Sequence, residues 1–201
     1  MMEAHAVKVA GTKEQILQAA CRLIHRQGFH NTSLDQILRE SGVGKGNFYY
    51  HFKSKDELGH AVLDRLALWT EQVGREIFRR DGDPLAEVFD LFDLIVQMQR
   101  EAGCVGGCPL GNLALEMSDI HDGFRQRIGG IIDSYRGYIA DALSRAQAKG
   151  QLAQNLHPQG AAEFIFAGIE GAILVAKVRK DVTVLEGCLA ELRNYLRTYV
   201  V

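Results

Sequence analysis

The chain has 201 residues, of which 47% are hydrophobic and 24% are charged, with a formal net charge of −2. This composition is typical of a compact globular protein, and the small net charge excludes a general coat for nucleic acids. No apolar run is long enough for a transmembrane helix, and no secretory signal precedes the first helix. Four cysteines without such a signal are typical of free thiols, so we expect a cytoplasmic protein that does not enter a membrane.

Helical periodicity dominates the sequence. Apolar residues recur mostly three and four positions apart and only three prolines occur, which predicts an all-α fold of about nine helices without strands. Residues 1–11 show no pattern and are expected to form a flexible arm. The expected helices run over about 13–27, 34–41, 45–52, 55–80, 84–101, 109–118, 122–149, 158–180 and 184–199. Four of the starts carry a capping box, namely Thr12–Gln15, Ser33–Gln36, Ser54–Glu57 and Thr183–Glu186.

Residues 33–52 have the pattern of a helix-turn-helix. Two short helices flank a glycine turn at 42–44, the arrangement that projects a second helix into a major groove. At about 100° per residue, Phe48 and Phe52 face inward, toward a core. The opposite face therefore points away from the protein.

That outer face is poor material for a core and suits DNA. It carries Lys45, Gly46, Asn47, Tyr49, Tyr50 and His51. A lysine can reach a phosphate or a guanine edge, and an asparagine can donate to a phosphate or pair with a base. A tyrosine can contact base edges, and a glycine lets the backbone approach the DNA closely. Thr32, Ser33 and Lys55 stand at helix N-termini, where phosphate binding is favourable.

The segment Gly42-Val43-Gly44-Lys45-Gly46-Asn47-Phe48-Tyr49-Tyr50-His51-Phe52-Lys53-Ser54-Lys55 resembles the signature of the TetR/AcrR family of transcriptional regulators. The close likeness covers residues 12–60, and Gly44 departs from the family's usual serine or threonine. The resemblance implies phosphate contacts for Tyr49, His51 and Lys55. It implies base-facing positions for Lys45, Gly46 and Tyr50, and a backbone contact for Asn47.

The family resemblance also implies the organisation of the chain. We expect a DNA-binding domain at residues 12–54, with three helices, and a regulatory and dimerisation domain at residues 55–201. Family members bind near-palindromic operators in double-stranded DNA as dimers. They release the DNA when a ligand or chemical signal acts on the regulatory domain. The resemblance thus implies a repressor, without catalytic residues, cofactor or bound metal, although an activator on the same fold stays open.

The last two helices are expected to form the homodimer interface. The helix at about 158–180 is apolar on nearly every side, and Gly168 and Gly171 permit close approach. The helix at about 184–199 adds apolar surface through Leu185, Leu189, Leu192 and Leu196. A monomer that buries both helices in its own core is the alternative.

The candidate sensor is a glycine-rich break with two thiols, Cys104 and Cys108. A helix N-terminus favours the thiolate, and glycines between the cysteines could allow a reversible disulfide. The segment is similar to that of the N-ethylmaleimide-reductase-repressor branch, where a cysteine at the position of Cys108 senses electrophiles and oxidants; Lys177 is a candidate positive neighbour. Two other interpretations stay open: packing cysteines beside a pocket for an unknown small-molecule inducer, and a metal held by Cys104, Cys108 and His121.

The alternative function from another class is a helical thiol oxidoreductase that uses Cys104 and Cys108. It would leave the exposed surface at residues 42–55 without a role. No set of nucleophile, base and orienting residue occurs in the sequence, so we do not expect an enzyme.

Overall fold

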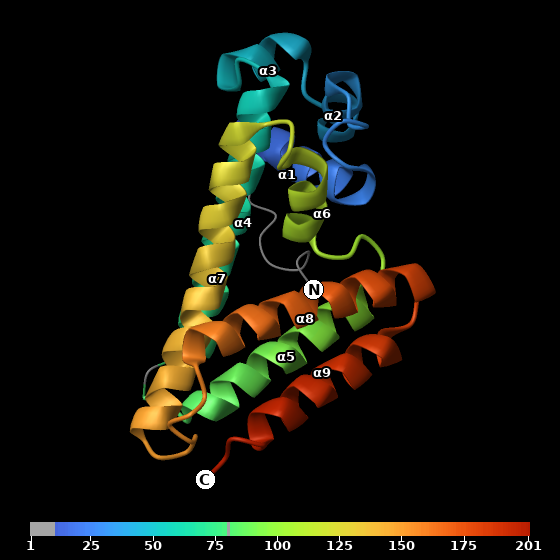
Figure 1. The fold of residues 1–201 in the computed structure, drawn as a ribbon. Helices are drawn as coiled ribbons and strands as arrows, with labels where there is room; N and C mark the ends of the chain where they lie inside the picture. Colours follow the sequence, from blue (N-terminus) through green and yellow to red (C-terminus); the bar gives the residue numbers. More distant parts are fainter. Residues whose placement is uncertain (1–10, 80) are drawn as a thin grey trace. The chain divides into compact units, whose positions relative to one another are not determined.

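The computed structural model describes residues 11–79 and 81–201, and these residues form nine helices (Figure 1). The helices are α1 (Thr12–Gln27), α2 (Leu34–Ser41), α3 (Lys45–His51), α4 (Lys55–Ile77), α5 (Pro84–Glu101), α6 (Pro109–Met117), α7 (Asp122–Ala148), α8 (Pro158–Arg179) and α9 (Val182–Arg197). The described part contains no strand, only an isolated bridge between Leu152 and Val200. The predicted all-α fold with nine helices is confirmed. The arm expected at residues 1–11 lies, except for Gly11, outside the described residues.

Local capping signals explain most helix starts. Ser33 and Gln36 form the predicted capping box of α2 in both directions. Asp83 caps α5 ahead of Pro84. His157 caps α8 through its imidazole, which accepts from the amide of Gly160 at 3.0 Å. These positions needed only local sequence to be predicted.

Two predicted capping boxes are wrong. Thr12 is the first residue of α1 and not its N-cap. Gly11 is the N-cap residue, and no side chain caps this helix. Likewise, α9 begins at Val182 because the carboxylate of Asp181 accepts from the amide of Thr183 and so occupies the cap position. At the start of α4, Ser54 accepts from the amide of Glu57 as predicted, but the Glu57 carboxylate accepts from the amide of Lys53 instead of that of Ser54.

The chain divides into two compact units. The first ends at Ala67 and also includes Pro109–Ile128; the second comprises Leu68–Cys108 and Gly129–Val201. This division differs from the boundary expected between residues 54 and 55, because the first part of α4 and the whole of α6 pack with the first unit.

Each unit has its own core. In the first, α1 packs against α2 and α3, and Ile16, Ile37 and Phe48 are fully buried. In the second, α9 packs against both α8 and α5, with buried leucines and isoleucines between them. None of the described helices combines the length and the apolar character that crossing a membrane requires.

Candidate nucleic-acid interface

The inner face of α3 anchors this short helix in the first unit. Phe48 is 0% exposed and Phe52 is 2% exposed, and their rings lie 5.8 Å apart between centroids. Gly42 ends α2 in the left-handed conformation at φ 68°, which glycine adopts without steric cost. The turn and the two phenylalanines therefore fix how α3 is presented.

The outer face of α3 is open to solvent. Tyr50 is 84% exposed and Tyr49 is 50% exposed, while Lys45, Gly46 and Asn47 are also exposed. A Cβ added at Gly46 would meet no atom within 4 Å. The ring of the half-buried His51 lies edge-on to that of Tyr50, with centroids 4.9 Å apart. The predicted residues of α3 thus share one accessible surface, which we call the α3 outer face.

The two residues predicted before α2 differ in accessibility. Ser33 is exposed, and its hydroxyl accepts from the amide of Gln36. Thr32 is 0% exposed, and its hydroxyl donates to the carbonyl of Gly28 at 2.6 Å. The prediction of a phosphate contact by the Thr32 side chain is therefore wrong, because that hydroxyl closes the turn after α1 and has no access to solvent.

The side chain of Lys55 packs against the first unit through its charged end. Its Nζ lies 4.3 Å from the centroid of the Phe29 ring, a cation–π contact, and the residue is half-buried. Burial lowers the pKa of Lys55, and the negative charge of Glu116 opposes that shift.

Glu116, on α6, clamps the turn between α1 and α2, a feature that no local sequence pattern indicated. Its carboxylate accepts from the amides of Phe29 and His30, each at 2.7 Å, and lies 2.9 Å from Nδ1 of His30. Burial acts to raise its pKa, but the hydrogen bonds from His30 and Phe29 outweigh it and hold the pKa of Glu116 below its ordinary range. The helix that follows Cys108 is thus bonded to the turn that leads into the helix-turn-helix.

The two predicted sensor cysteines have different surroundings in the second unit. Cys104 is 2% exposed and adopts φ 54°, and its carbonyl accepts from Nζ of Lys180 at 3.2 Å. Cys108 is half-buried, and its thiol donates to the carboxylate of Glu170. Both are thiols in the structure, as are Cys21 and Cys188.

Charged and aromatic side chains surround the glycine-rich break. A Cβ at Gly107 would lie 2.8 Å from Cδ of Lys177, so the lysine stem passes directly beside the residue before Cys108. Burial raises the pKa of Glu170, and it raises the pKa of Tyr135, to which the charges of Cys108 and Glu170 add. A metal site of the two cysteines and His121 was one interpretation of the sequence. In the structure His121 lies with Asp56 and His60 instead.

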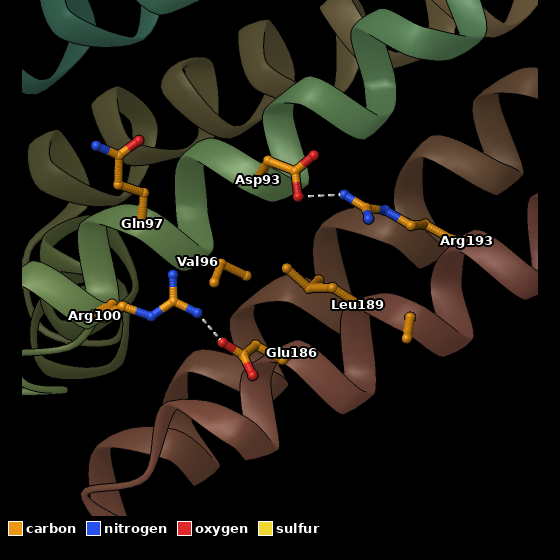
Figure 2. A pocket seen from close by; sticks show the side chains of 8 residues that line it. Asp93, Val96, Gln97, Arg100, Glu186, Leu189 and Arg193 are labelled. Atoms are coloured by element: carbon orange, nitrogen blue, oxygen red, sulfur yellow. Dashed lines mark hydrogen bonds and ion pairs between the residues drawn. The ribbon is translucent and has the colours of Figure 1, made fainter.

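An open groove of about 460 Å³ lies in the second unit between α5 and α9 (Figure 2). Ion pairs cross it between Arg100 and Glu186 and, at 2.6 Å, between Arg193 and Asp93. A cavity inside the unit, lined by residues that include Gly74 and Tyr135, measures only about 10 Å³ and has room for one water molecule at most.

The apolar residues of α8 and α9 fall into two groups. The four predicted leucines of α9 are between 0% and 6% exposed, and a Cβ at Gly168 would lie 3.1 Å from Leu192. The prediction that these leucines and Gly168 supply dimer surface is wrong, because they join α8 and α9 within one chain. Exposed apolar side chains instead follow one stripe of α8, namely Phe164, Leu174, Val175 and Val178, with the open Gly171 among them.

Two family models match the two parts of the chain. A family model described as "Bacterial regulatory proteins, tetR family" matches residues 16–62, and one described as "Tetracyclin repressor-like, C-terminal domain" matches residues 84–192. An uncharacterized HTH-type transcriptional regulator in the lacX 3' region of Lactococcus lactis subsp. lactis is 38% identical over 176 residues, which are 87% of this chain and 88% of that one.

Two further relatives cover nearly the whole chain. The HTH-type transcriptional repressor NemR of Escherichia coli is 27% identical over 195 residues, 94% of this chain and 96% of its own. The crystal structure of a regulatory protein TetR from Rhodobacter sphaeroides matches with a TM-score of 0.86 and 26% identity, over 94% of this chain and 99% of that one. Regulators of this kind are DNA-binding proteins and not enzymes, so the alternative of a thiol oxidoreductase is wrong. The chain belongs to the TetR family of bacterial transcriptional regulators.

Proposed function

We propose that this regulator represses transcription by binding a near-palindromic operator as a homodimer through the α3 outer face, and that modification of Cys108 releases it. The observation that carries the DNA-binding part is the contrast within one short helix: Phe48 is 0% exposed and Tyr50 is 84% exposed. A large aromatic side chain on the outside of a helix exposes apolar surface to water, which is unfavourable unless a partner covers that surface. Base edges in a major groove supply such a partner, and Lys45 and Asn47 beside it offer the charge and amide that DNA recognition uses.

The homodimer is supported by the apolar stripe on α8. TetR-family regulators bind DNA operators and dimerise through the C-terminal domain. Val178 is 75% exposed and Leu174 is 52% exposed, and they follow Phe164 along the same side of the helix. Contiguous exposed apolar side chains of this kind mark a protein interface. We infer that two copies pair across this stripe and so hold two α3 outer faces over one symmetric site.

Release by cysteine modification is supported by accessibility. Cys108 is half-buried, whereas Cys104 is 2% exposed and closed off from a reagent in solvent. The cavity beside Gly74 and Tyr135 holds only about 10 Å³, and the groove of about 460 Å³ between α5 and α9 is open and crossed by ion pairs. Neither is an enclosed apolar pocket for an organic inducer, so a reactive group at the start of α6 is the better supported sensor.

The chemistry follows from the partner of the thiol. When Cys108 attacks an electron-poor alkene, a sulfur–carbon bond forms, the carbon–carbon double bond opens, and the thiol proton passes to the Glu170 carboxylate. That proton then moves to the carbanion carbon, which balances the addition. Because burial raises the pKa of Glu170, its carboxylate is a stronger proton acceptor than an ordinary one.

Selection of bound duplexes from a pool of random DNA tests the proposal with the full-length protein. We expect a near-palindromic sequence bound by two chains, released by N-ethylmaleimide, and retained under the same treatment by Cys108→Ser. Enrichment of no symmetric sequence contradicts the DNA-binding part. Release of Cys108→Ser at the wild-type rate contradicts the sensor part, and release by an unreactive organic ligand alone favours a pocket that opens on binding.

A further inference from the structure

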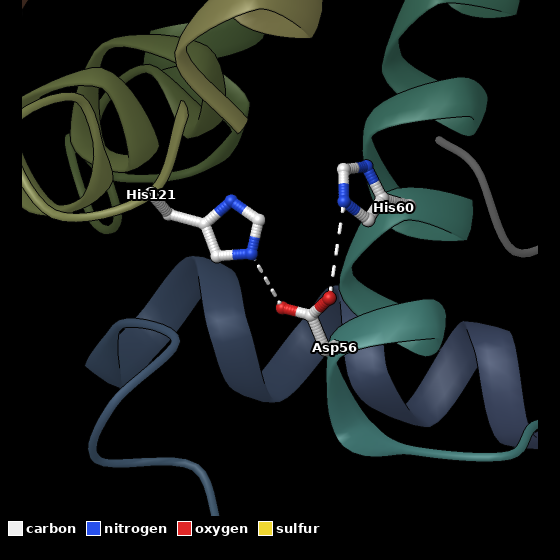
Figure 3. Close-up of side chains that lie close together, drawn as sticks. All are labelled: Asp56, His60 and His121. Atoms are coloured by element: carbon white, nitrogen blue, oxygen red, sulfur yellow. Dashed lines mark ion pairs between the residues drawn. The ribbon is translucent and has the colours of Figure 1, made fainter. Parts of the chain in front are cut away.

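Three potential metal ligands that are not part of the α3 outer face meet in the first unit. Asp56 and His60 lie one turn apart on α4, and His121 lies directly before α7 (Figure 3). Nε2 of His121 is 2.9 Å from Oδ1 of Asp56, and Nε2 of His60 is 3.9 Å from Oδ2 of the same carboxylate. Among the described residues this is the one group of three His, Cys, Asp or Glu side chains whose ligand atoms all lie within 4.8 Å of one another.

We propose that Asp56, His60 and His121 bind a divalent transition-metal ion of the zinc class, with water as the fourth ligand. Two imidazole nitrogens and one carboxylate oxygen are a donor set that such ions prefer. The spacing of four residues puts Asp56 and His60 on the same side of α4, so two ligands are already aligned. With metal–ligand bonds of about 2.1 Å, tetrahedral ligand atoms lie about 3.4 Å apart, so the site has to contract by little more than 1 Å.

The residues around the three ligands hold the two imidazoles close to one another. A Cβ at Gly123 would lie 3.1 Å from Cε1 of His60 and 3.2 Å from Cε1 of His121, so any other residue would push the two imidazoles apart. The Phe124 ring packs against both, with centroid distances of 4.8 Å to His60 and 4.6 Å to His121. The two ligands are thus held against one apolar wall, which restricts their orientation.

The tautomer of His121 gives the site a measurable consequence. Its Nδ1 accepts from the amide of Phe124 at 3.1 Å, so the ring proton stands on Nε2 and is donated to Asp56. A metal on Nε2 displaces that proton, which moves to Nδ1 of the same ring. The amide of Phe124 then loses its acceptor, so metal binding and the bond in the first turn of α7 exclude one another.

Titration of the full chain with Co²⁺, after treatment with a chelator, tests the site. We expect one ion per chain and visible d–d absorption without the near-ultraviolet band of a cobalt–thiolate bond, which separates this site from the cysteines. The amide signal of Phe124 should shift and lose protection from hydrogen exchange in step with the titration.

Variants assign the ligands. His60→Ala and Asp56→Asn should each weaken Co²⁺ binding by more than about tenfold, while His25→Ala, a matched change on α1, should leave it unchanged. Circular dichroism checks folding, and Asp56→Asn keeps the size of the side chain if His60→Ala does not fold. No stoichiometric binding, a thiolate band, or equal affinity in Asp56→Asn and the wild type overturns the proposal.

Discussion

The carboxylate of Glu116 occupies the space that a side chain at Gly28 would need. A Cβ at Gly28 would lie 2.8 Å from Oε2 of Glu116, and the glycine has φ 85°, a conformation that other residues rarely adopt. The missing side chain lets the carboxylate reach the amides of Phe29 and His30 from a helix 86 positions farther along the chain. A small residue and a distant acid therefore act together to hold the turn before α2.

Glu116→Gln should destabilise the protein by about 1–3 kcal/mol at neutral pH, because one charge-assisted acceptor is lost. The pKa of Glu116 is lowered in the folded state, so its contribution is present above the unfolded glutamate pKa of about 4.3 and is lost as the pH falls through the lower folded pKa. The difference in unfolding free energy between wild type and variant should therefore shrink below about pH 4. Denaturant unfolding at several pH values measures it.

Glu40→Gln is the matched control for this prediction. Glu40 pairs with Arg22 at 3.2 Å on the exposed surface, where such a pair contributes about 0–1 kcal/mol. If both variants lose the same free energy of unfolding, the two hydrogen bonds from backbone amides to Glu116 contribute no more stability than a surface ion pair.

Tyr50→Ala should weaken binding to the selected operator by about tenfold or more without a change in thermal stability, because the side chain is 84% exposed and contributes little to the core. Fluorescence anisotropy with operator and random duplexes measures the loss of specificity. Tyr50→Phe separates the hydroxyl from the ring. Unchanged discrimination in Tyr50→Ala would show that another face of the protein reads the bases.

Lys55→Met should weaken binding to all DNA sequences alike and flatten the dependence of log affinity on log salt by about 0.9 for one lost phosphate contact. Methionine keeps an apolar stem over the Phe29 ring, so the change reports mainly the charge. Lys149→Met, directly after α7 in the second unit, is the control and should leave the salt slope as it is. A shift in base preference for Lys55→Met would contradict a phosphate contact.

Helix positions followed from the sequence, but the bonds between helices did not. Ser33, Asp83 and His157 act on amides two or three residues away, so local pattern was enough to place α2, α5 and α8. Thr12 and Thr183 failed because Gly11 and Asp181, one or two positions earlier, take the cap. The α3 outer face was readable because alternation of buried and exposed positions within one helix is local.

The remaining features join segments that are far apart in the chain. The Glu116 clamp spans 87 positions to Phe29, and the meeting of His121 with Asp56 depends on how α6 and α4 pack in the first unit. The burial of Thr32 was missed for a related reason, since a threonine before a helix looks the same whether its hydroxyl faces solvent or the carbonyl of Gly28.

Val178→Glu should raise the dissociation constant of the dimer by more than about tenfold, because it places a charge in the apolar stripe of α8 that pairing is expected to bury. Leu115→Glu, at an 83% exposed position on α6, introduces the same charge outside the stripe and should leave the dimer intact. Sedimentation velocity over a concentration series measures both. Equal dissociation of the dimer in the two variants, or dissociation in neither, would show that the stripe is not part of the interface.

Cys108→Ser should make operator binding resistant to N-ethylmaleimide and to a quinone, whereas Cys188→Ser should remain as sensitive as the wild type. Cys188 is the matched control because it is exposed on α9, so it reacts without reporting on the start of α6. Glu170→Gln should slow the modification of Cys108, measured by mass spectrometry against time, because an amide cannot take the thiol proton. If Cys188→Ser protects operator binding and Cys108→Ser does not, release passes through α9 and the start of α6 is not the sensor.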